Sequence, residues 1–207
     1  MERQGTRDLR IWLDAACHPE VAGVCSSPIH SNIAELDFPT IYTTNYDQWI
    51  EEAHKVRGKP FAKITSVIDL AKPNHGETEI VKFHGDFSDE DSLVLTEANY
   101  FDRMSLETPL DIKLRSDSLA RPLLFIGYSL SDPNMPYILY RLQRLWDGSP
   151  HKSQRPKSYT LLSTANAVQE KVLEARGVIP IVWNNEDPGK SLVEFLAHLV
   201  ESVRPAR

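Results

Sequence analysis

The sequence predicts an α/β fold in which a mostly parallel, Rossmann-like sheet is flanked by helices. Short apolar, β-rich segments recur along the chain, and segments of helical period lie between several of them. This alternation is typical of layered folds with parallel strands. The stretch "RPLLFIG" is apolar from Leu123 to Ile126, as expected of a central strand that is covered on both faces.

The predicted strands are short and rich in β-branched or aromatic residues, and they cover residues 40–43, 61–65, 80–83, 93–95, 122–126, 158–162 and 179–183. Helices are predicted where apolar residues recur at intervals of three and four, in residues 45–56, 134–146 and 192–203. In the first of these helices, the expected apolar face comprises Tyr46, Trp49, Ile50, Ala53 and Val56.

Length and composition favour one globular domain over residues 1–207. The net charge of −6 disfavours direct binding of nucleic acid, and no apolar run has the length of a membrane span. Cys17 and Cys25 form no C-x-x-C pair, so the sequence predicts a cytoplasmic protein without a structural zinc site.

Polar side chains follow three of the predicted strands at once, in "IYTTNYD", "IVKFHGD" and "LLFIGYSLSDPN". Ligands of parallel sheets bind beyond the carboxyl ends of the strands, so these turns are candidate binding elements. In the segment "IYTTNYD", Asn45 or Asp47 is expected at or inside the first helical turn that follows the strand. Taken alone, helix capping explains these two residues better than ligand binding does.

In the second turn, His84 directly follows an apolar strand and precedes Gly85. It is either a partly buried histidine that binds a loop carbonyl or a general base, a task that imidazole performs near neutral pH. Gly85 would let another segment of the chain or a ligand approach closely. In the third turn, helix initiation explains Asp132-Pro133, whereas Gly127 and Ser129 are placed for a phosphate or a ribose.

Two other site types fit less well. No G-x-G-x-x-G follows a first strand, so an ordinary dehydrogenase is not predicted. A metal hydrolase would use Asn45, Asp47, His84 and Asp86, but the remaining histidines have no recognisable ligand spacing. We therefore predict that no metal takes part.

Taken in order, "TTNYD", "KFHGD", "LTEANY" and "LLFIGYSLSDPN" resemble the sirtuin-like family of the silent information regulator type. The resemblance is closest to the bacterial branch that lacks the zinc module and acts in anti-phage systems that deplete NAD. It covers the chain from about residue 30, so residues 1–29 are poorly matched and residues 86–121 are expected to be a small helical insert.

This resemblance implies an NAD hydrolase that releases nicotinamide and ADP-ribose, with His84 as the catalytic base. Asn45 would contact the nicotinamide ribose and position a water molecule, and Asp47 would help to hold the nicotinamide amide. Gly127 and Ser129 would hold the NAD backbone. The adenosine end is expected at Asn184 and Asn185, and no role follows for Tyr100. The implied NAD-contacting set is Thr43, Asn45, Asp47, Gly127, Ser129 and Asn184, with Asn45 and His84 as the catalytic pair.

The family's N-terminal glycine-rich strand and loop is not recognisable in this sequence. The chain is then a piece of a longer protein, a shortened homologue without activity, or part of a site that a protein partner or a second copy completes. A noncatalytic nucleotide-binding or assembly module is the alternative function. Protein deacylation is a further alternative, although no zinc cysteines lie between His84 and Gly127.

Overall fold

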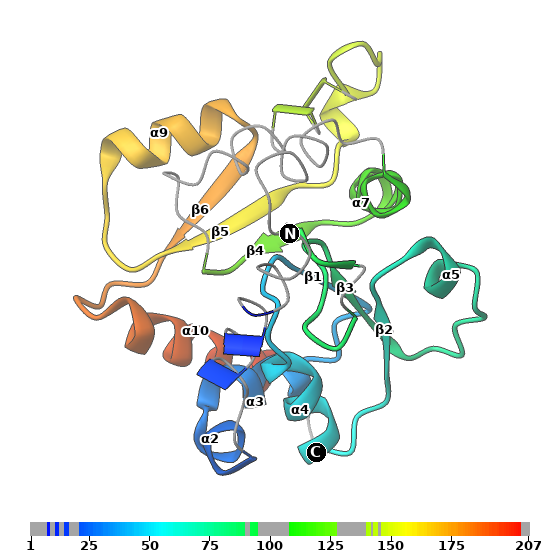
Figure 1. The fold of residues 1–207 in the computed structure, drawn as a ribbon. Coiled ribbons are helices and arrows are strands. Elements are labelled where there is room, and N and C mark those ends of the chain that lie inside the picture. Colours follow the sequence, from blue (N-terminus) through cyan, green and yellow to red (C-terminus); the bar gives the residue numbers. More distant parts are fainter. Residues whose placement is uncertain are drawn as a thin grey trace. The chain divides into compact units, whose positions relative to one another are not determined.

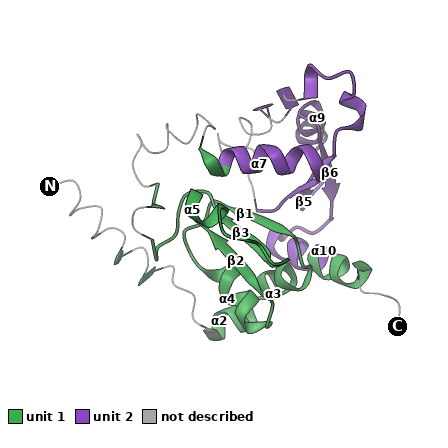
Figure 2. Ribbon diagram, turned by 90° about the vertical axis from the view of Figure 1, so that its right-hand side faces the viewer, with its two compact units in different colours: residues 1–110, 196–207 green, residues 111–195 purple. Residues whose placement is uncertain are grey.

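The structure is a computed structural model that describes residues 8, 11–12, 15–16, 21–89, 92–94, 108–127, 140–141, 143–144 and 146–203. The chain divides into two compact units (Figure 2). One comprises Met1–Leu110 with Leu196–Arg207, and the other comprises Asp111–Phe195. The single domain expected over residues 1–207 stays a prediction.

The first unit contains a three-stranded parallel sheet (Figure 1). Its strands are β1 (Thr40–Thr43), β2 (Phe61–Ile64) and β3 (Thr78–Lys82), and β3 lies between the other two. Thr43 is the register partner of Lys82, and Ile64 is the partner of Val81. Because the strands are parallel, their carboxyl ends lie at the same edge of the sheet.

Helices of the first unit connect and precede these strands. They are α2 (Val21–Ser26), α3 (Pro28–Glu35), α4 (Trp49–Val56) and α5 (Val67–Leu70). Proline begins α3, where its missing N–H has no helical partner to lose. In α4, acidic residues stand in the first turn and basic residues in the last, which complements the helix dipole.

The core of the first unit is formed by the sheet and by the α2–α4 helices. Ile64, Ile80 and Val81 are buried in the sheet. Val24, Ala34 and Ala53 form a cluster with Trp49 packed against it. The apolar face predicted for α4 is only partly correct, because Val56 is 44% exposed while Glu51 and His54 are buried. Glu51 pairs with Lys82, as described below, and Nδ1 of His54 is hydrogen-bonded to the Ile50 carbonyl at 2.8 Å.

The second unit has its own three-stranded parallel sheet. β5 (Ser158–Leu162) lies between β4 (Leu123–Phe125) and β6 (Val178–Val182). Leu162, Leu173 and Val178 form its core cluster, with Phe125 and Val182 packed against it. Among the described residues, β4 pairs only with β5, and its side chains are half-buried. The described part of the structure therefore does not place β4 at the centre of a sheet, where the sequence predicted it.

Helices α7 (Pro109–Ala120), α9 (Ala167–Ala175) and α10 (Pro188–Val203) and a 3-10 turn (Lys152–Gln154) complete the described elements. α10 belongs to the second unit up to Phe195 and to the first from Leu196. The Asn166 side chain caps α9 by accepting hydrogen bonds from the N–H groups of Val168 and Gln169. None of the described helices is both long and apolar enough to cross a bilayer.

Most sequence predictions of secondary structure agree with the structure. The α/β class with parallel strands and flanking helices is confirmed, and helix α7 lies within the expected insert. The strand expected at residues 93–95 is wrong at Leu93 and Val94, and Leu95 lies outside the described residues. Of the helix expected at residues 134–146, the described positions 140–141, 143–144 and 146 are helical.

Candidate functional site

Two of the three predicted polar turns leave neighbouring strands at the same edge of the first sheet. The turn with Asn45 and Asp47 follows β1, and the turn with His84 and Asp86 follows β3. The N–H of Phe83 donates to the carbonyl of Thr43 at 2.8 Å, so the pairing of the two strands continues to the point where the turns begin. The structure thus brings together two segments about forty residues apart in sequence.

The turn after β1 is held by its own side chains. Thr43 is buried, and its hydroxyl oxygen accepts a hydrogen bond from the N–H of Asn45 at 3.1 Å. Oδ1 of Asp47 accepts from the N–H of Trp49 at 3.2 Å. Because α4 begins at Trp49 with Gln48 as its N-cap, the prediction that Asn45 stands in the first helical turn is wrong. The capping interpretation applies to Asp47, and Asn45 is exposed before the helix.

Tyr46 connects the two turns. Its ring packs against the rings of His84 and Phe87, with centroids 6.2 Å and 5.5 Å away. Its hydroxyl donates to the carbonyl of Val94 at 2.7 Å, and the N–H of Val94 donates to the carbonyl of His84 at 2.9 Å. The backbone of Val94 therefore binds side-chain or backbone groups of both turns.

Gly85 is required by the close approach of another chain segment. Its φ is +91°, in the left-handed region, and a Cβ there would collide with the carbonyl group of Ser92. The N–H of Asp86 donates to the Ser92 hydroxyl at 3.0 Å, so the two segments are also hydrogen-bonded. Of the two reasons that the sequence offered for this glycine, the structure supports the approach of a chain segment.

We expect Gly85→Ala to be more destabilising than Gly76→Ala, by roughly 1 kcal/mol or more in free energy of unfolding. Gly76 has a similar φ of +87°, but no atom lies within 4 Å of the position that its Cβ would take. Both variants force alanine into a left-handed backbone conformation, which costs free energy, and only Gly85→Ala adds the collision with the Ser92 carbonyl group. Urea denaturation of the two variants measures the difference, and equal losses would contradict this account.

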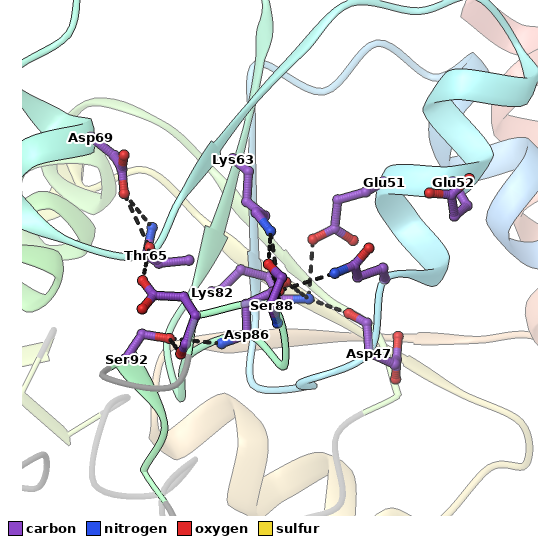
Figure 3. A network of polar contacts seen from close by, with 12 residues as sticks. Asp47, Glu51, Glu52, Lys63, Thr65, Asp69, Lys82, Asp86, Ser88 and Ser92 are labelled. Atoms are coloured by element: carbon purple, nitrogen blue, oxygen red, sulfur yellow. Dashed lines mark hydrogen bonds and ion pairs between the residues drawn. The ribbon is translucent and has the colours of Figure 1, made fainter. Parts of the chain in front are cut away.

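A buried cluster of charged side chains lies beside these turns (Figure 3). Nζ of Lys82 lies 3.1 Å from Oε1 of Glu51 and 3.3 Å from Oδ2 of Asp86, and it donates a hydrogen bond to the backbone carbonyl of Asp47. Lys63 adds a second ion pair to Asp86 at 3.1 Å. The side chains of Glu51, Lys82 and Asp86 are each at most 3% exposed.

The environment raises the pKa of the Glu51 carboxylate and lowers the pKa of the Asp86 carboxylate. Burial raises the pKa of Glu51, and the nearby Lys82 charge only partly opposes it. Burial also raises the pKa of Asp86, but hydrogen bonds from Ser88 and the charges of Lys82 and Lys63 outweigh it and lower the value to about 2. Asp86 is therefore a structural anion, and its two lysine partners make it a poor metal ligand.

Sequence reasoning did not predict this cluster. Two signals were present, namely a lysine at the end of the apolar strand in "EIVKF" and a glutamate inside the α4 pattern. Among the described residues, no group of three or more histidine, cysteine, aspartate and glutamate side chains is arranged to hold a metal ion.

His30 is a further titratable side chain near the turn that follows β1, and it lies in α3. Its ring stacks on Trp49 with centroids 5.1 Å apart, and its Nδ1 is hydrogen-bonded to the Ser27 hydroxyl at 2.7 Å. Burial lowers the pKa of His30, against the opposing charge of Asp47. The neutral imidazole is thus favoured, which suits a packing partner of Trp49.

The remaining predicted site residues belong to the second unit. Gly127 follows β4 with a φ of +71°, and no atom of the described residues lies within 4 Å of the position of a Cβ. Asn184 is exposed after β6, and the neighbouring Asn185 donates to Glu194 at 3.3 Å. Ser129 and Tyr100 lie outside the described residues, as do Asp132 and Pro133.

Comparison with protein families gives a match that includes the Asn45, His84 and Gly127 turns and ends before Asn184. Residues 39–181 match the family described as "SIR2-like domain". The NAD(+) hydrolase ThsA of Acinetobacter baumannii (strain 532279) is 35% identical over 118 residues, or 56% of this chain and 24% of that protein. The NAD(+) hydrolase ThsA of Cytobacillus dafuensis is 36% identical over 126 residues, or 59% of this chain and 25% of that protein.

A third relative, the Defense-associated sirtuin 2 of Bacillus subtilis, is 33% identical over 131 residues, which are 61% of this chain and 13% of that protein. The chain thus spans about a quarter of the length of the two hydrolases that it matches.

Proposed function

The chain belongs to the SIR2-like family, and from this premise we propose that it hydrolyses NAD to nicotinamide and ADP-ribose. The observation that carries the proposal is the common sheet edge at which the Asn45 turn and the His84 turn emerge. Relatives named NAD(+) hydrolase, with 35% and 36% identity to this chain, support it.

Cleavage of the bond between nicotinamide and ribose passes through an oxocarbenium-like centre, as glycoside hydrolysis does. The protein must orient the ribose, accommodate the departing nicotinamide and deliver a water molecule. We assign His84 as the general base and Asn45 as the group that contacts the ribose and positions the water. Asn45 is exposed, and the His84 ring is backed by Tyr46, so an amide and an imidazole are available without a metal.

Asp47 is proposed to hold the nicotinamide amide, and Thr43 to contact the substrate from the end of β1. Gly127, Ser129 and Asn184 are proposed to bind the rest of NAD, as the family resemblance implies. The left-handed backbone of Gly127, where no Cβ projects from the turn after β4, supports close approach of a ligand there.

Anti-phage defence is the proposed biological setting. The name of the Bacillus subtilis relative, Defense-associated sirtuin 2, supports a role in defence. We also propose that the protein works in the cytoplasm, and its cysteine usage supports this location. We propose further that it acts as a homo-oligomer or with a protein partner, which family resemblance alone supports. Light scattering of the purified protein at several concentrations tests for self-association.

The function is tested by incubating the purified protein with NAD and measuring nicotinamide and ADP-ribose by mass spectrometry. Nicotinamide release in equal amount to ADP-ribose supports hydrolysis. Binding of ADP-ribose without any release would indicate a noncatalytic module instead. Release that requires an acyl-lysine peptide would indicate a deacylase.

A further inference from the structure

The Lys82 side chain contacts both turns of the candidate site and also α4 (Figure 3). It is the last residue of β3, and its side chain is 1% exposed. Its ammonium group binds the Asp47 carbonyl in the first turn, two residues after Asn45. It also pairs with Asp86 in the second turn, two residues after His84.

Stability does not account for this buried ammonium group. Removing an ammonium group from water costs several kcal/mol, and apolar replacements of buried ion pairs are often neutral or stabilising. Groups that perform chemistry, in contrast, must be held within about 0.5 Å of their productive positions. A single cation that binds the backbone of one turn and a side chain of the other restricts the distance between them, in addition to the hydrogen bond from the Gln48 amide to Asp86 at 3.1 Å.

We propose that Lys82 is a positioning residue that holds the Asn45 turn in register with the His84 turn. The proposal rests on the NAD hydrolysis proposed above. Lys82 is too deeply buried to touch the substrate, so it acts through the backbone of the Asp47 turn and through Asp86. Glu51 is the counter-charge that keeps the ammonium group in place from the side of α4.

The test compares Lys82→Met with Lys63→Met. Lys63 also pairs with Asp86, from the neighbouring strand β2, but its contacts are with Asp86 and Ser88 and do not include the first turn. We expect Lys82→Met to lower kcat for nicotinamide release by about 10-fold to 100-fold with little change in KM, because misplacement by about 1 Å has effects of this size. Lys63→Met should retain kcat within about threefold.

A double variant separates positioning from stability. Lys82→Met leaves Glu51 buried without its cation, and adding Glu51→Gln removes that charge. We expect the double variant to regain thermal stability while kcat stays low, because the bond to the Asp47 carbonyl is still missing. Recovery of kcat together with stability would show a merely structural role and would overturn the proposal.

Hydrogen–deuterium exchange gives a readout that does not depend on activity. Peptides covering residues 43–49 should exchange faster in Lys82→Met and in the double variant than in the wild type or Lys63→Met. Unchanged exchange in Lys82→Met would overturn the positioning role. If the wild type releases no nicotinamide, the proposed hydrolysis fails, and the exchange comparison still decides whether Lys82 holds the two turns.

Discussion

His84→Ala is expected to reduce nicotinamide release from NAD by about 10²-fold to 10⁴-fold, the usual contribution of a well-placed general base. Its fold should survive, because the carbonyl that accepts from the Val94 N–H is a backbone group that the substitution keeps. The lost contact with the Tyr46 ring should cost no more than about 1 kcal/mol. Initial rates at saturating NAD measure the effect.

His75→Ala is the matched control, because His75 is an exposed histidine in the loop before β3. Its rate should equal that of the wild type. Circular dichroism and thermal unfolding of both variants separate a catalytic loss from an unfolded sample. A His84→Ala protein that is folded and retains full turnover would remove His84 from the role of base.

Asp86→Ala is expected to lower the free energy of unfolding by roughly 3–5 kcal/mol, as breaking a buried ion pair does. The carboxylate also accepts hydrogen bonds from the Ser88 N–H at 2.8 Å, the Ser88 hydroxyl at 2.5 Å and the Gln48 amide at 3.1 Å. Its removal leaves all of these donors and two lysines without this acceptor. Guanidinium denaturation at pH 7 measures the loss.

The same variant should show a characteristic pH dependence. The pKa of Asp86 is lowered from 3.8 to about 2, so its contribution to stability is fully present above pH 3.8 and is lost as the pH falls through 2. The stability gap between wild type and Asp86→Ala should therefore shrink between pH 5 and pH 2. Glu52→Ala, which breaks the exposed pair with Lys55, should cost less than about 1 kcal/mol at either pH. A gap that stays constant down to pH 2 would contradict the assignment.

Local sequence patterns predicted strands β1 to β6 and the positions of the turns, although the strand expected at residues 93–95 is wrong at Leu93 and Val94. Residues 158–162 form β5 with the predicted bounds, and residues 40–43 form β1, because alternating and apolar segments of this length have few other ways to satisfy their backbone. The family resemblance then selected Asn45, for which helix capping had been the better local explanation, and His84, for which a structural histidine had been the alternative.

The start of α4 shows where local pattern fails. The helical spacing of apolar residues predicts a helix from Asn45 onward, but the helix begins at Trp49, because the Asp47 side chain accepts a hydrogen bond from the Trp49 N–H. Competition between a side chain and the helix for the same backbone group is decided by the geometry of the whole turn.

The sequence by itself determined the α/β class, the approximate positions of strands β1 to β6, and which turns carry amide and imidazole groups. Tertiary structure decided that Lys82, Glu51 and Asp86 are buried together and that Gly85 faces the Ser92 carbonyl. The physical reason is the same in both cases. Hydrophobic period is a property of neighbours in sequence, whereas the partners of a buried charge come from segments that only the strand register brings together.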